Sequence, residues 1–385
     1  MDYLLTEQQR MIKDIARKIA QERLLPVRAE LDEKEEFPWD IIKDIAQADL
    51  FGLIIPEEYG GLGGGVFESA IAIEEFARVC AGVTTTYAAS GLGTYPILIA
   101  GNDQQKKNYL PDIAAGKRLA AFAITEANAG SDAGNIMTTA VKDGDVYILN
   151  GTKQWITNGG EADIYTVIAM TDKNKGARGS SVFIVEKGDA GFSFGKKEKK
   201  MGIRSSATRE LIFDNCRIQA DRLLGKVGHG FVIAMKTFDK SRPGIGAAAV
   251  GLAQGALDMA VEYAKERVQF GQPIISFQAI QHMLADMATQ TEAARALVYA
   301  VARYIDSGGS SVAKEAAMVK YFASDVAMKV TTDAVQIMGG YGYMREYSAE
   351  KMMRDAKILQ IFEGTNQIQR NIVGIALNKE YTKRK

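Results

Sequence analysis

The chain has 385 residues, of which 47% are apolar and 24% charged, and its 47 Lys and Arg residues balance its 47 Asp and Glu residues. This is the composition of an ordinary globular protein too long for one small core, and the zero net charge argues against a nucleic-acid-binding surface as the main function. The two cysteines lie far apart in sequence (Cys80 and Cys216) and there are only two histidines, which excludes a disulfide framework, a Cys-X-X-Cys site and a histidine-based metal centre, so no metal is expected.

The N-terminal segment, residues 1–7, carries neither a basic-then-apolar leader nor an Arg-rich transit peptide. We also find no apolar run of the roughly 18 residues that a bilayer-spanning helix needs. The sequence therefore predicts a complete, cytoplasmic, bacterial protein without membrane insertion. A processed mitochondrial matrix protein is the alternative, disfavoured because the chain begins with Met1.

Residues 1–117 are predicted to form an all-helical N-terminal domain. Leu5, Ile12, Ile15 and Ile19 recur at the three- and four-residue spacing of an amphipathic helix. Further helices are expected over residues 39–47, 67–80 and 104–115. The glycine-rich segment 59–65 has no strand–turn–helix context, so it is predicted to be a connector rather than a phosphate-binding loop.

Residues 118–226 are predicted to form a middle β domain, a barrel or a sandwich. The apolar run 146–149 leads into Asn150 and Gly151, a strong hairpin-turn signal. Short β-rich runs follow at 164–170, 181–185 and 210–213, separated by Gly and Asp turns. The chain is therefore expected to contain an all-β middle part.

Residues 227–385 are predicted to form a C-terminal helical bundle. Helix formers with helical periodicity cover residues 231–267, 277–305, 311–338 and 349–356. Their Ala- and Met-rich stretches are typical of a bundle core. The fold class expected for the whole chain is thus a multidomain α+β protein of helical, β and helical parts in that order.

One carboxylate stands out near the C-terminus, in the sequence Ile361-Phe362-Glu363-Gly364. A glutamate between apolar residues has a raised pKa because desolvation disfavours its charged form, which suits proton exchange near neutral pH. Gly364 would let a ligand approach the backbone closely. The alternative is the first turn of a helix, where the helix dipole favours a glutamate.

This segment and five others resemble the acyl-CoA dehydrogenases, flavoenzymes that oxidise acyl thioesters to enoyl thioesters. The six segments occur in the order and spacing of that family: 124–132, 154–160, 238–243, 267–271, 336–342 and 361–370. The medium-chain and short-chain branches are the most similar. One departure is Ala127, where the family usually has proline.

The resemblance implies that Glu363 removes the α-proton of the thioester. Its neighbours Ile361 and Phe362 are expected to supply the apolar wall that raises its pKa. The β-hydrogen must leave as hydride, which no side chain accepts, and without a Rossmann fingerprint a flavin is favoured over a nicotinamide. Some branches carry the base at the position of Ser241, which is no base here, so Glu363 is the expected catalytic residue.

The resemblance also implies the FAD site. Residues expected beside the flavin are Phe122, Ile124, Thr125, Gly130, Ser131, Trp155 and Thr157. Thr365 and Gln367 are expected to make further FAD contacts. Residues expected to reach the FAD of a neighbouring subunit are Arg267, Phe270, Gln278, Gln336, Gly339 and Gly340. Arginine suits that role because its planar fork matches phosphate geometry. The expected assembly is a homotetramer, a dimer of dimers.

For the CoA part of the substrate, the resemblance implies Ser131, Phe238, Asp239, Arg242 and Gly364. The acyl group is expected along the helix that carries Thr84, Tyr87, Ala88 and Gly91. No Arg or Lys occurs between positions 83 and 100, and a buried distal carboxylate would need such a partner, so dicarboxylic acyl groups are disfavoured. Short and medium straight chains come first, with branched, cyclic and aryl-propionyl chains left open.

Three points stay open. The basic run 196–200 could attract CoA phosphates or form a solvated turn. The electrons are expected to pass to an electron-transferring flavoprotein, although the same fold can run in reverse as an enoyl-CoA reductase, and an acyl-CoA oxidase is disfavoured by the chain length. Outside enzymes, the alternatives are a non-catalytic CoA- or flavin-binding protein and a structural helical scaffold.

Overall fold

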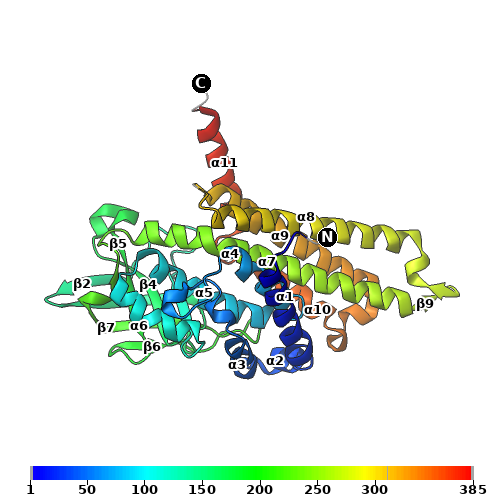
Figure 1. The fold of residues 1–385 in the computed structure, drawn as a ribbon, viewed down its shortest axis with the longest axis horizontal. Coiled ribbons are helices and arrows are strands. Elements are labelled where there is room, and N and C mark those ends of the chain that lie inside the picture. Colours follow the sequence, from blue (N-terminus) through cyan, green and yellow to red (C-terminus); the bar gives the residue numbers. More distant parts are fainter. Residues whose placement is uncertain (1–2, 310, 383–385) are drawn as a thin grey trace.

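The computed structural model describes residues 3–309 and 311–382, which form a helical part, a sheet and a second helical part in chain order (Figure 1). The sheet lies at one end of the elongated molecule and the long helices extend to the other end. This confirms the predicted fold class, whereas the exact domain boundaries stay predictions.

The N-terminal part contains six α-helices. They are α1 (Glu7–Ile19), α2 (Arg28–Lys34), α3 (Trp39–Gln47), α4 (Val66–Ala77), α5 (Ala81–Ala100) and α6 (Asp103–Ala114). α1 begins at a capping box between Thr6 and Gln9 and buries Ile12 and Ala16 on one face. α2 is short and exposes most of its residues, so no apolar periodicity signalled it.

The middle part is a mixed sheet in the order β6-β7-β3-β2-β4-β5-β8, with β1 pairing in parallel with β4. Its strands are β1 (Ala120–Ala123), β2 (Thr139–Asp143), β3 (Val146–Thr157), β4 (Ile164–Met170), β5 (Ser180–Glu186), β6 (Phe192–Phe194), β7 (Thr208–Gln219) and β8 (Leu223–Leu224). Every residue of β4 is buried, which explains its unbroken apolar sequence.

The hairpin expected at Asn150 and Gly151 is wrong. The chain turns earlier, since Asp143 of β2 pairs with Val146 of β3 across a two-residue loop. Gly144, with φ +58°, supplies the left-handed backbone of that loop. Asn150 and Gly151 instead lie inside β3 at a register shift against β7, a β-bulge, where glycine is also favoured.

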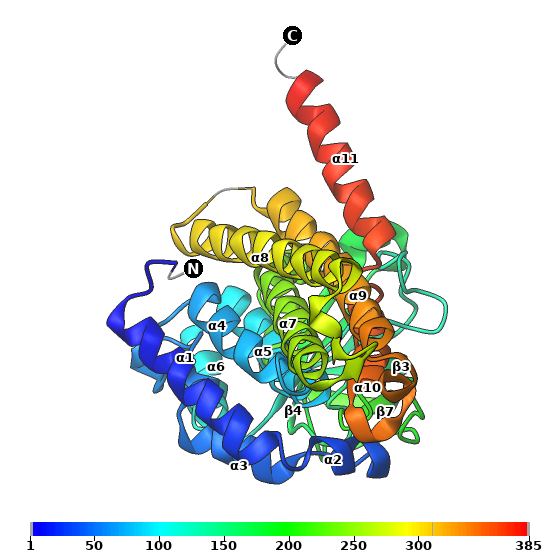
Figure 2. The same ribbon diagram turned by 90° about the vertical axis from the view of Figure 1, so that its right-hand side faces the viewer.

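The C-terminal part packs four helices together and projects a fifth away from the body (Figure 2). Its elements are α7 (Gly230–Glu266), β9 (Val268–Gln269), β10 (Gln272–Pro273), α8 (Gln278–Asp306), α9 (Ala313–Met338), α10 (Ala349–Leu359) and α11 (Asn366–Thr382). The Ala-rich faces lie in the core, as Ala247 and Ala249 show with no exposed surface. α11 is the projecting helix, and it was not predicted.

α7 corrects one expectation, because it is long and apolar enough to cross a membrane by length and composition alone. Its most apolar 18-residue window is 78% buried inside the protein. That burial is typical of the core helix of a soluble protein.

α5 connects the two kinds of structure. It packs on β1 so closely that a Cβ at Gly93 would lie 2.5 Å from the Ala121 nitrogen. It also packs along α7. Side chains from α5, β1 and α7 therefore meet in one place, close to the end of α10 and the start of α11.

Candidate active site

Glu363 lies in a strained turn between α10 and α11. Its φ is +51° and that of Gly364 is +92°, so both residues have left-handed backbone, which is unfavourable for the glutamate. Gln369 Nε2 donates to the Glu363 and Gly364 carbonyls at 3.1 and 3.0 Å, and Arg242 Nε donates to the Glu363 carbonyl at 3.4 Å. α11 begins only at Asn366, so Glu363 is not in the first turn of a helix.

The Glu363 carboxylate accepts a hydrogen bond from Ser241 Oγ, 2.6 Å from Oε2. Burial raises the pKa of Glu363, and this outweighs the opposing effects of the Ser241 hydrogen bond and of the Arg242 and Lys320 charges. A carboxylate with a raised pKa is a competent proton acceptor near neutral pH.

The apolar wall around Glu363 differs from the expectation. Ile361 is 47% exposed, and Phe362 packs against the main hydrophobic core. Neither lines the cavity at Glu363, because the left-handed turn directs the carboxylate away from its sequence neighbours. The apolar surroundings come instead from distant residues, among them Ile73 of α4 and Ile245 of α7.

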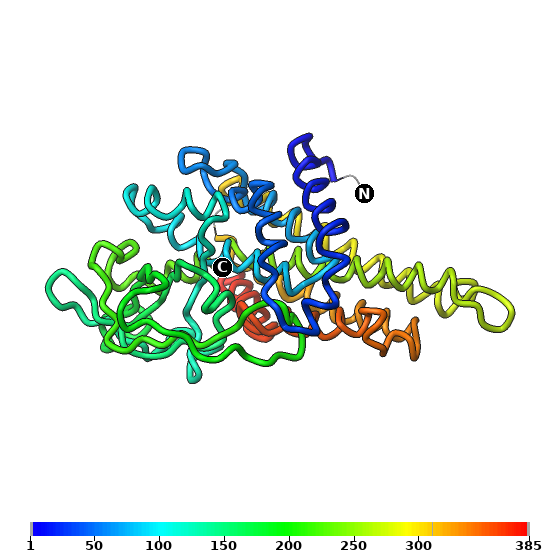
Figure 3. The backbone as a smooth tube through the Cα atoms, turned by 90° about the horizontal axis from the view of Figure 1, so that it is seen from below, coloured from blue at the N-terminus to red at the C-terminus, as the bar shows by residue number. Residues whose placement is uncertain are grey.

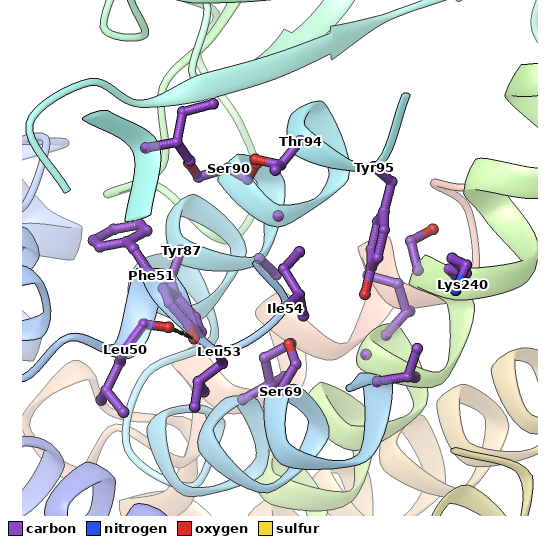
Figure 4. Close-up of a pocket in the computed structure, with 18 of the residues that line it drawn as sticks. Leu50, Phe51, Leu53, Ile54, Ser69, Tyr87, Ser90, Thr94, Tyr95 and Lys240 are labelled. Carbon is purple, nitrogen blue, oxygen red and sulfur yellow. Dashed lines mark hydrogen bonds between the residues drawn. The ribbon is translucent and has the colours of Figure 1, made fainter. Parts of the chain in front are cut away.

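Glu363 lines a cavity together with residues of α4, α5, α7 and the segment after α3. Figure 4 shows side chains of this lining, among them Ser69, Tyr87 and Lys240. Three of the four predicted acyl-pocket residues line the cavity: Tyr87, Ala88 and Gly91. The Tyr87 hydroxyl donates to the Leu50 carbonyl at 2.7 Å, which fixes the ring at the cavity wall. Thr84 is fully buried elsewhere, and its hydroxyl donates to the Cys80 carbonyl at 2.8 Å.

The lining also contains polar residues that no sequence motif singled out, among them Ser69, Thr94, Tyr95 and Lys240. Tyr95 of α5 points its hydroxyl toward Ile54 and the α7 side of the cavity, and Lys240 of α7 lies at the edge (Figure 4). Lys240 is a cation at the cavity edge, so the absence of Arg and Lys from residues 83–100 does not by itself exclude a dicarboxylic chain.

The predicted flavin-contact residues gather beside this cavity, around the end of β1. Phe122 and Ile124 are buried there, with the Phe122 ring edge-on to Phe238 of α7 at 5.6 Å. Across from them, the Thr125 carbonyl accepts from the Gln154 backbone at 2.8 Å. β1 is thus tied to the end of β3, which carries the other predicted contacts.

That end of β3 exposes a flat aromatic surface. Trp155 is 58% exposed and has a φ of +61°, whereas the following Ile156 is buried and Thr157 is half-buried. In the loop after β1, Gly130 and Ser131 are exposed, and a Cβ at Gly130 would meet no atom within 4 Å. An exposed indole beside open backbone suits a planar aromatic ligand.

The turn that contains Ala127 is closed by two backbone hydrogen bonds. The Glu126 backbone donates to the Ala129 carbonyl at 3.2 Å, and the Ala129 backbone donates back to the Glu126 carbonyl at 3.0 Å. These two hydrogen bonds close the turn around Ala127 without help from a proline.

A second group of predicted FAD contacts lies at the far end of the helices, remote from the sheet. The β9–β10 hairpin is at the tip opposite the sheet (Figure 3). Phe270 on this hairpin is 94% exposed with φ +52°, and the Arg267 guanidinium lies 5.5 Å from the centre of the Tyr341 ring. The others are also exposed there: Gln278, Gln336, Gly339 and Gly340. One chain therefore does not bring the two groups together.

The predicted CoA residues on α7 are packed tightly. Phe238 is buried, the Arg242 guanidinium lies 5.3 Å from its ring centre, and burial raises the pKa of Asp239. Arg242 is itself only 4% exposed and is turned toward Glu363, so its geometry favours support of the turn. Gly364 belongs to that turn, whereas Ser131 is exposed.

Two predicted groups remain: the FAD contacts Thr365 and Gln367, and the basic run 196–200. Thr365 Oγ1 accepts from the Ile368 backbone at 3.3 Å, whereas Gln367 is exposed. In the basic run, Lys197 donates to the Glu35 carbonyl and Lys200 to the Ser206 carbonyl. Burial lowers the pKa of Lys200 to about 8, so this segment is not a simple solvated turn.

Lys153 and Lys320 are fully buried, although nothing in the sequence around either lysine predicts its burial. Lys153 bridges the Glu126 carboxylate and the Ile124 carbonyl, and Lys320 reaches the Gly364 carbonyl.

In residues 3–309 and 311–382 no cluster of His, Cys, Asp or Glu suited to a metal ion occurs.

Three family models match the chain in sequence. They describe the N-terminal, middle and C-terminal domains of acyl-CoA dehydrogenases and cover residues 6–117, 121–216 and 228–377. This family consists of flavin-dependent oxidoreductases of CoA thioesters. The chain belongs to the acyl-CoA dehydrogenase family.

Named relatives lie close in sequence and structure. The solved butyryl-CoA dehydrogenase of Megasphaera elsdenii has a TM-score of 0.95, with 46% identity over 98% of this chain and 100% of that chain. A structure described as the electron-transferring flavoprotein of Acidaminococcus fermentans has a TM-score of 0.96 and 51% identity, covering 98% and 99%. The acryloyl-CoA reductase (NADH) of Anaerotignum propionicum is 48% identical over 97% of this chain and 95% of its own length.

The family's cofactor is FAD, and the residues present fit it. The exposed Trp155 indole and the open backbone at Gly130 suit a flat ring system beside β1. The Glu363 carboxylate lines the cavity that α5 and α7 border.

Ser241→Ala is expected to shift the acid limb of the pH dependence of kcat/KM to higher pH. The Ser241 hydroxyl stabilises the ionised Glu363, so its loss raises the pKa of the base and a higher pH is needed to ionise it. A pH profile of the variant measures this. Ser241→Thr keeps a hydroxyl and serves as the control, and an unmoved acid limb in Ser241→Ala would show that the hydrogen bond does not tune the base.

Proposed function

We propose that this enzyme dehydrogenates a short-chain acyl-CoA to the trans-2-enoyl-CoA, with Glu363 as the base. The observation that carries the proposal is the Glu363 carboxylate, which lines a largely apolar cavity and whose pKa is raised by burial. FAD supplies the hydride acceptor, because no side chain can accept the β-hydrogen as hydride.

The proposed roles of the chain's own residues follow from the geometry. The acyl chain lies between α4, α5 and α7, and the Glu363 carboxylate takes the α-proton. The family resemblance implies that the Glu363 backbone amide donates to the thioester carbonyl, and such a donor stabilises the enolate-like oxygen. The cavity excludes bulk water around the carboxylate, which keeps its pKa raised.

The apolar lining of the cavity, which includes Ile54, Ile73 and Ile245, suits an acyl chain without polar groups. The Tyr87 ring, held by its hydrogen bond to the Leu50 carbonyl, stands in the cavity wall. The short chain length is proposed from the butyryl-CoA dehydrogenase relative.

The substrate test is an anaerobic titration of the holoprotein with saturated acyl-CoAs of increasing length and with glutaryl-CoA, following the oxidised-flavin absorption band. We expect the short straight chains to bleach the band at the lowest concentrations and glutaryl-CoA to fail. Equal bleaching by glutaryl-CoA would overturn the exclusion of dicarboxylic chains, and preference for long chains would overturn the short-chain assignment.

The reverse reaction is a second candidate, favoured by the 48% identity to an acryloyl-CoA reductase. The residues serve both directions, since the acid formed from Glu363 can return its proton to the α-carbon. Turnover of an enoyl-CoA with a reduced electron-transferring flavoprotein, faster than acyl-CoA oxidation with the oxidised one, would establish the reductase.

The partner proposals follow from the relatives and from the far-end residues. An electron-transferring flavoprotein is the proposed electron partner, because the description of the A. fermentans structure names such a protein. The proposed location is a bacterial cytoplasm, since the named relatives are bacterial. The exposed Phe270 and the half-buried Arg267 are proposed to reach FAD in a second subunit, within a homotetramer. Sedimentation equilibrium of the holoprotein measures that assembly, and a monomer that retains FAD would contradict it.

A further inference from the structure

Lys320 of α9 is a fully buried lysine that the proposed chemistry does not use. Its Nζ donates to the Gly364 carbonyl at 2.8 Å and to Asn366 Oδ1 at 3.0 Å. Lysines are almost never fully buried unless they are paired, and both acceptors here are neutral oxygens. The Lys320 side chain therefore binds the segment 364–366, which directly follows the proposed base Glu363.

That segment needs support because of its backbone. Left-handed conformations at Glu363 and Gly364 persist only where the surroundings over-determine them. The Gly364 carbonyl accepts from both Lys320 and Gln369. Gln369 belongs to α11, which projects from the body, whereas Lys320 belongs to a helix of the bundle core, so Lys320 ties the turn to the rigid part of the molecule.

The other end of the turn is fixed to the same stretch of α9. Asn366, where α11 begins, donates from Nδ2 to Ser324 Oγ at 2.9 Å and to Asp325 Oδ1 at 2.8 Å. Its Oδ1 accepts from Lys320. Residues 320, 324 and 325 thus hold Gly364 and Asn366 in one hydrogen-bonded network.

We propose that Lys320 is a positioning residue that fixes the Glu363–Gly364 turn against α9 and so keeps the carboxylate on the cavity wall. The inference rests on the proposed function in taking Glu363 as the base. Lys320 touches neither substrate nor flavin in this assignment and acts through the turn.

The charge of Lys320 adds a second effect. The charged groups that face it are Glu363 in the turn, Arg242 on α7 and Asp325 on its own helix. Burial lowers the pKa of Lys320 to about 7, while its positive charge lowers the pKa of Glu363. A neutral amine still donates hydrogen bonds, so the turn stays fixed above that pH while the electrostatic support of the ionised base is lost.

The test compares Lys320→Met with Lys329→Met in the holoprotein. Lys329 is on the same helix, half-exposed and paired with Asp333, so its replacement removes a lysine of α9 outside the network. Hydrogen–deuterium exchange of residues 360–366 is expected to rise about tenfold in Lys320→Met and to stay unchanged in Lys329→Met.

Flavin reduction by a short acyl-CoA is expected to be about a hundredfold slower in Lys320→Met, because a displacement of about 1 Å in a reacting group can cost that much. The loss falls on kcat, while KM and FAD content stay near those of Lys329→Met. Lys320→Met that matches Lys329→Met in exchange and in rate overturns the inference.

The inference stays testable if Lys320→Met does not fold, and also if no acyl-CoA bleaches the wild type. If Lys320→Met fails to fold, Lys320→Gln decides, because its shorter amide cannot reach both acceptors: slow reduction with FAD bound supports the inference, and wild-type rate and exchange overturn it. If the wild type itself is not bleached by any acyl-CoA, the proposed function fails, and the exchange of residues 360–366 still decides the positioning role.

Discussion

Glu363→Gln is expected to slow flavin reduction by butyryl-CoA about 10²- to 10⁴-fold, the usual contribution of a general base. The amide keeps the size of the side chain and its contact with Ser241, but it cannot accept the α-proton. Stopped-flow mixing under anaerobic conditions measures the rate, and the flavin spectrum before mixing measures the FAD content.

The matched control for this variant is Glu346→Gln, on an exposed turn before α10. It is expected to reduce its flavin at the wild-type rate. A Glu363→Gln enzyme that retains FAD and reduces it as fast as this control would show that another group removes the α-proton.

Lys153→Met is expected to destabilise the protein by about 3–5 kcal/mol, the cost of leaving one member of a buried ion pair unpaired. Lys153 has no exposed surface and Glu126 is 4% exposed, with 2.7 Å between Nζ and Oε1. Burial alone would raise the pKa of Glu126, yet the Lys153 charge and the hydrogen bonds from the Met137 and Thr138 backbones hold it below its usual value. Without Lys153, the Glu126 carboxylate is left unpaired in the interior, close to the end of β1.

Urea unfolding of the holoprotein measures the loss, and FAD retention is expected to weaken because Lys153 also holds the Ile124 carbonyl. The double variant Lys153→Met, Glu126→Gln is expected to recover much of the stability, since it removes the uncompensated charge. Lys175→Met, which breaks an exposed pair with Asp172, is the surface control at about 1 kcal/mol or less. A double variant that is no more stable than Lys153→Met would refute this electrostatic account.

Regular elements could be predicted from the sequence where periodicity and burial coincide. The expected helix at 39–47 and the expected strand at 164–170 have the bounds of α3 and β4. The hairpin signal at Asn150 and Gly151 failed because the same residue pair also suits a bulge, and only the pairing with β7 decides between the two. The exposed α2 and the projecting α11 lack the apolar periodicity that reveals a packed helix.

Candidate site residues could be predicted from the sequence only where a motif contains the reactive side chain itself. Glu363 was found in this way, but the wall around it was assigned to Ile361 and Phe362, and a left-handed turn reverses such an assignment. The groups that hydrogen-bond to Glu363 and to its turn come from α7, α9 and α11, far apart in sequence. Burial of Lys153 and Lys320 depends on tertiary packing, which no local pattern of charged residues reveals.

The central claim is that Glu363 takes the α-proton of a short acyl-CoA bound in the cavity between α4, α5 and α7. Its most direct test is to mix butyryl-CoA anaerobically with the wild type and with Glu363→Gln, both loaded with FAD, and to follow the oxidised-flavin band. We predict rapid loss of the band in the wild type and at least a hundredfold slower loss in the variant. An unchanged band in the wild type, or equal rates in the two proteins, would contradict the account.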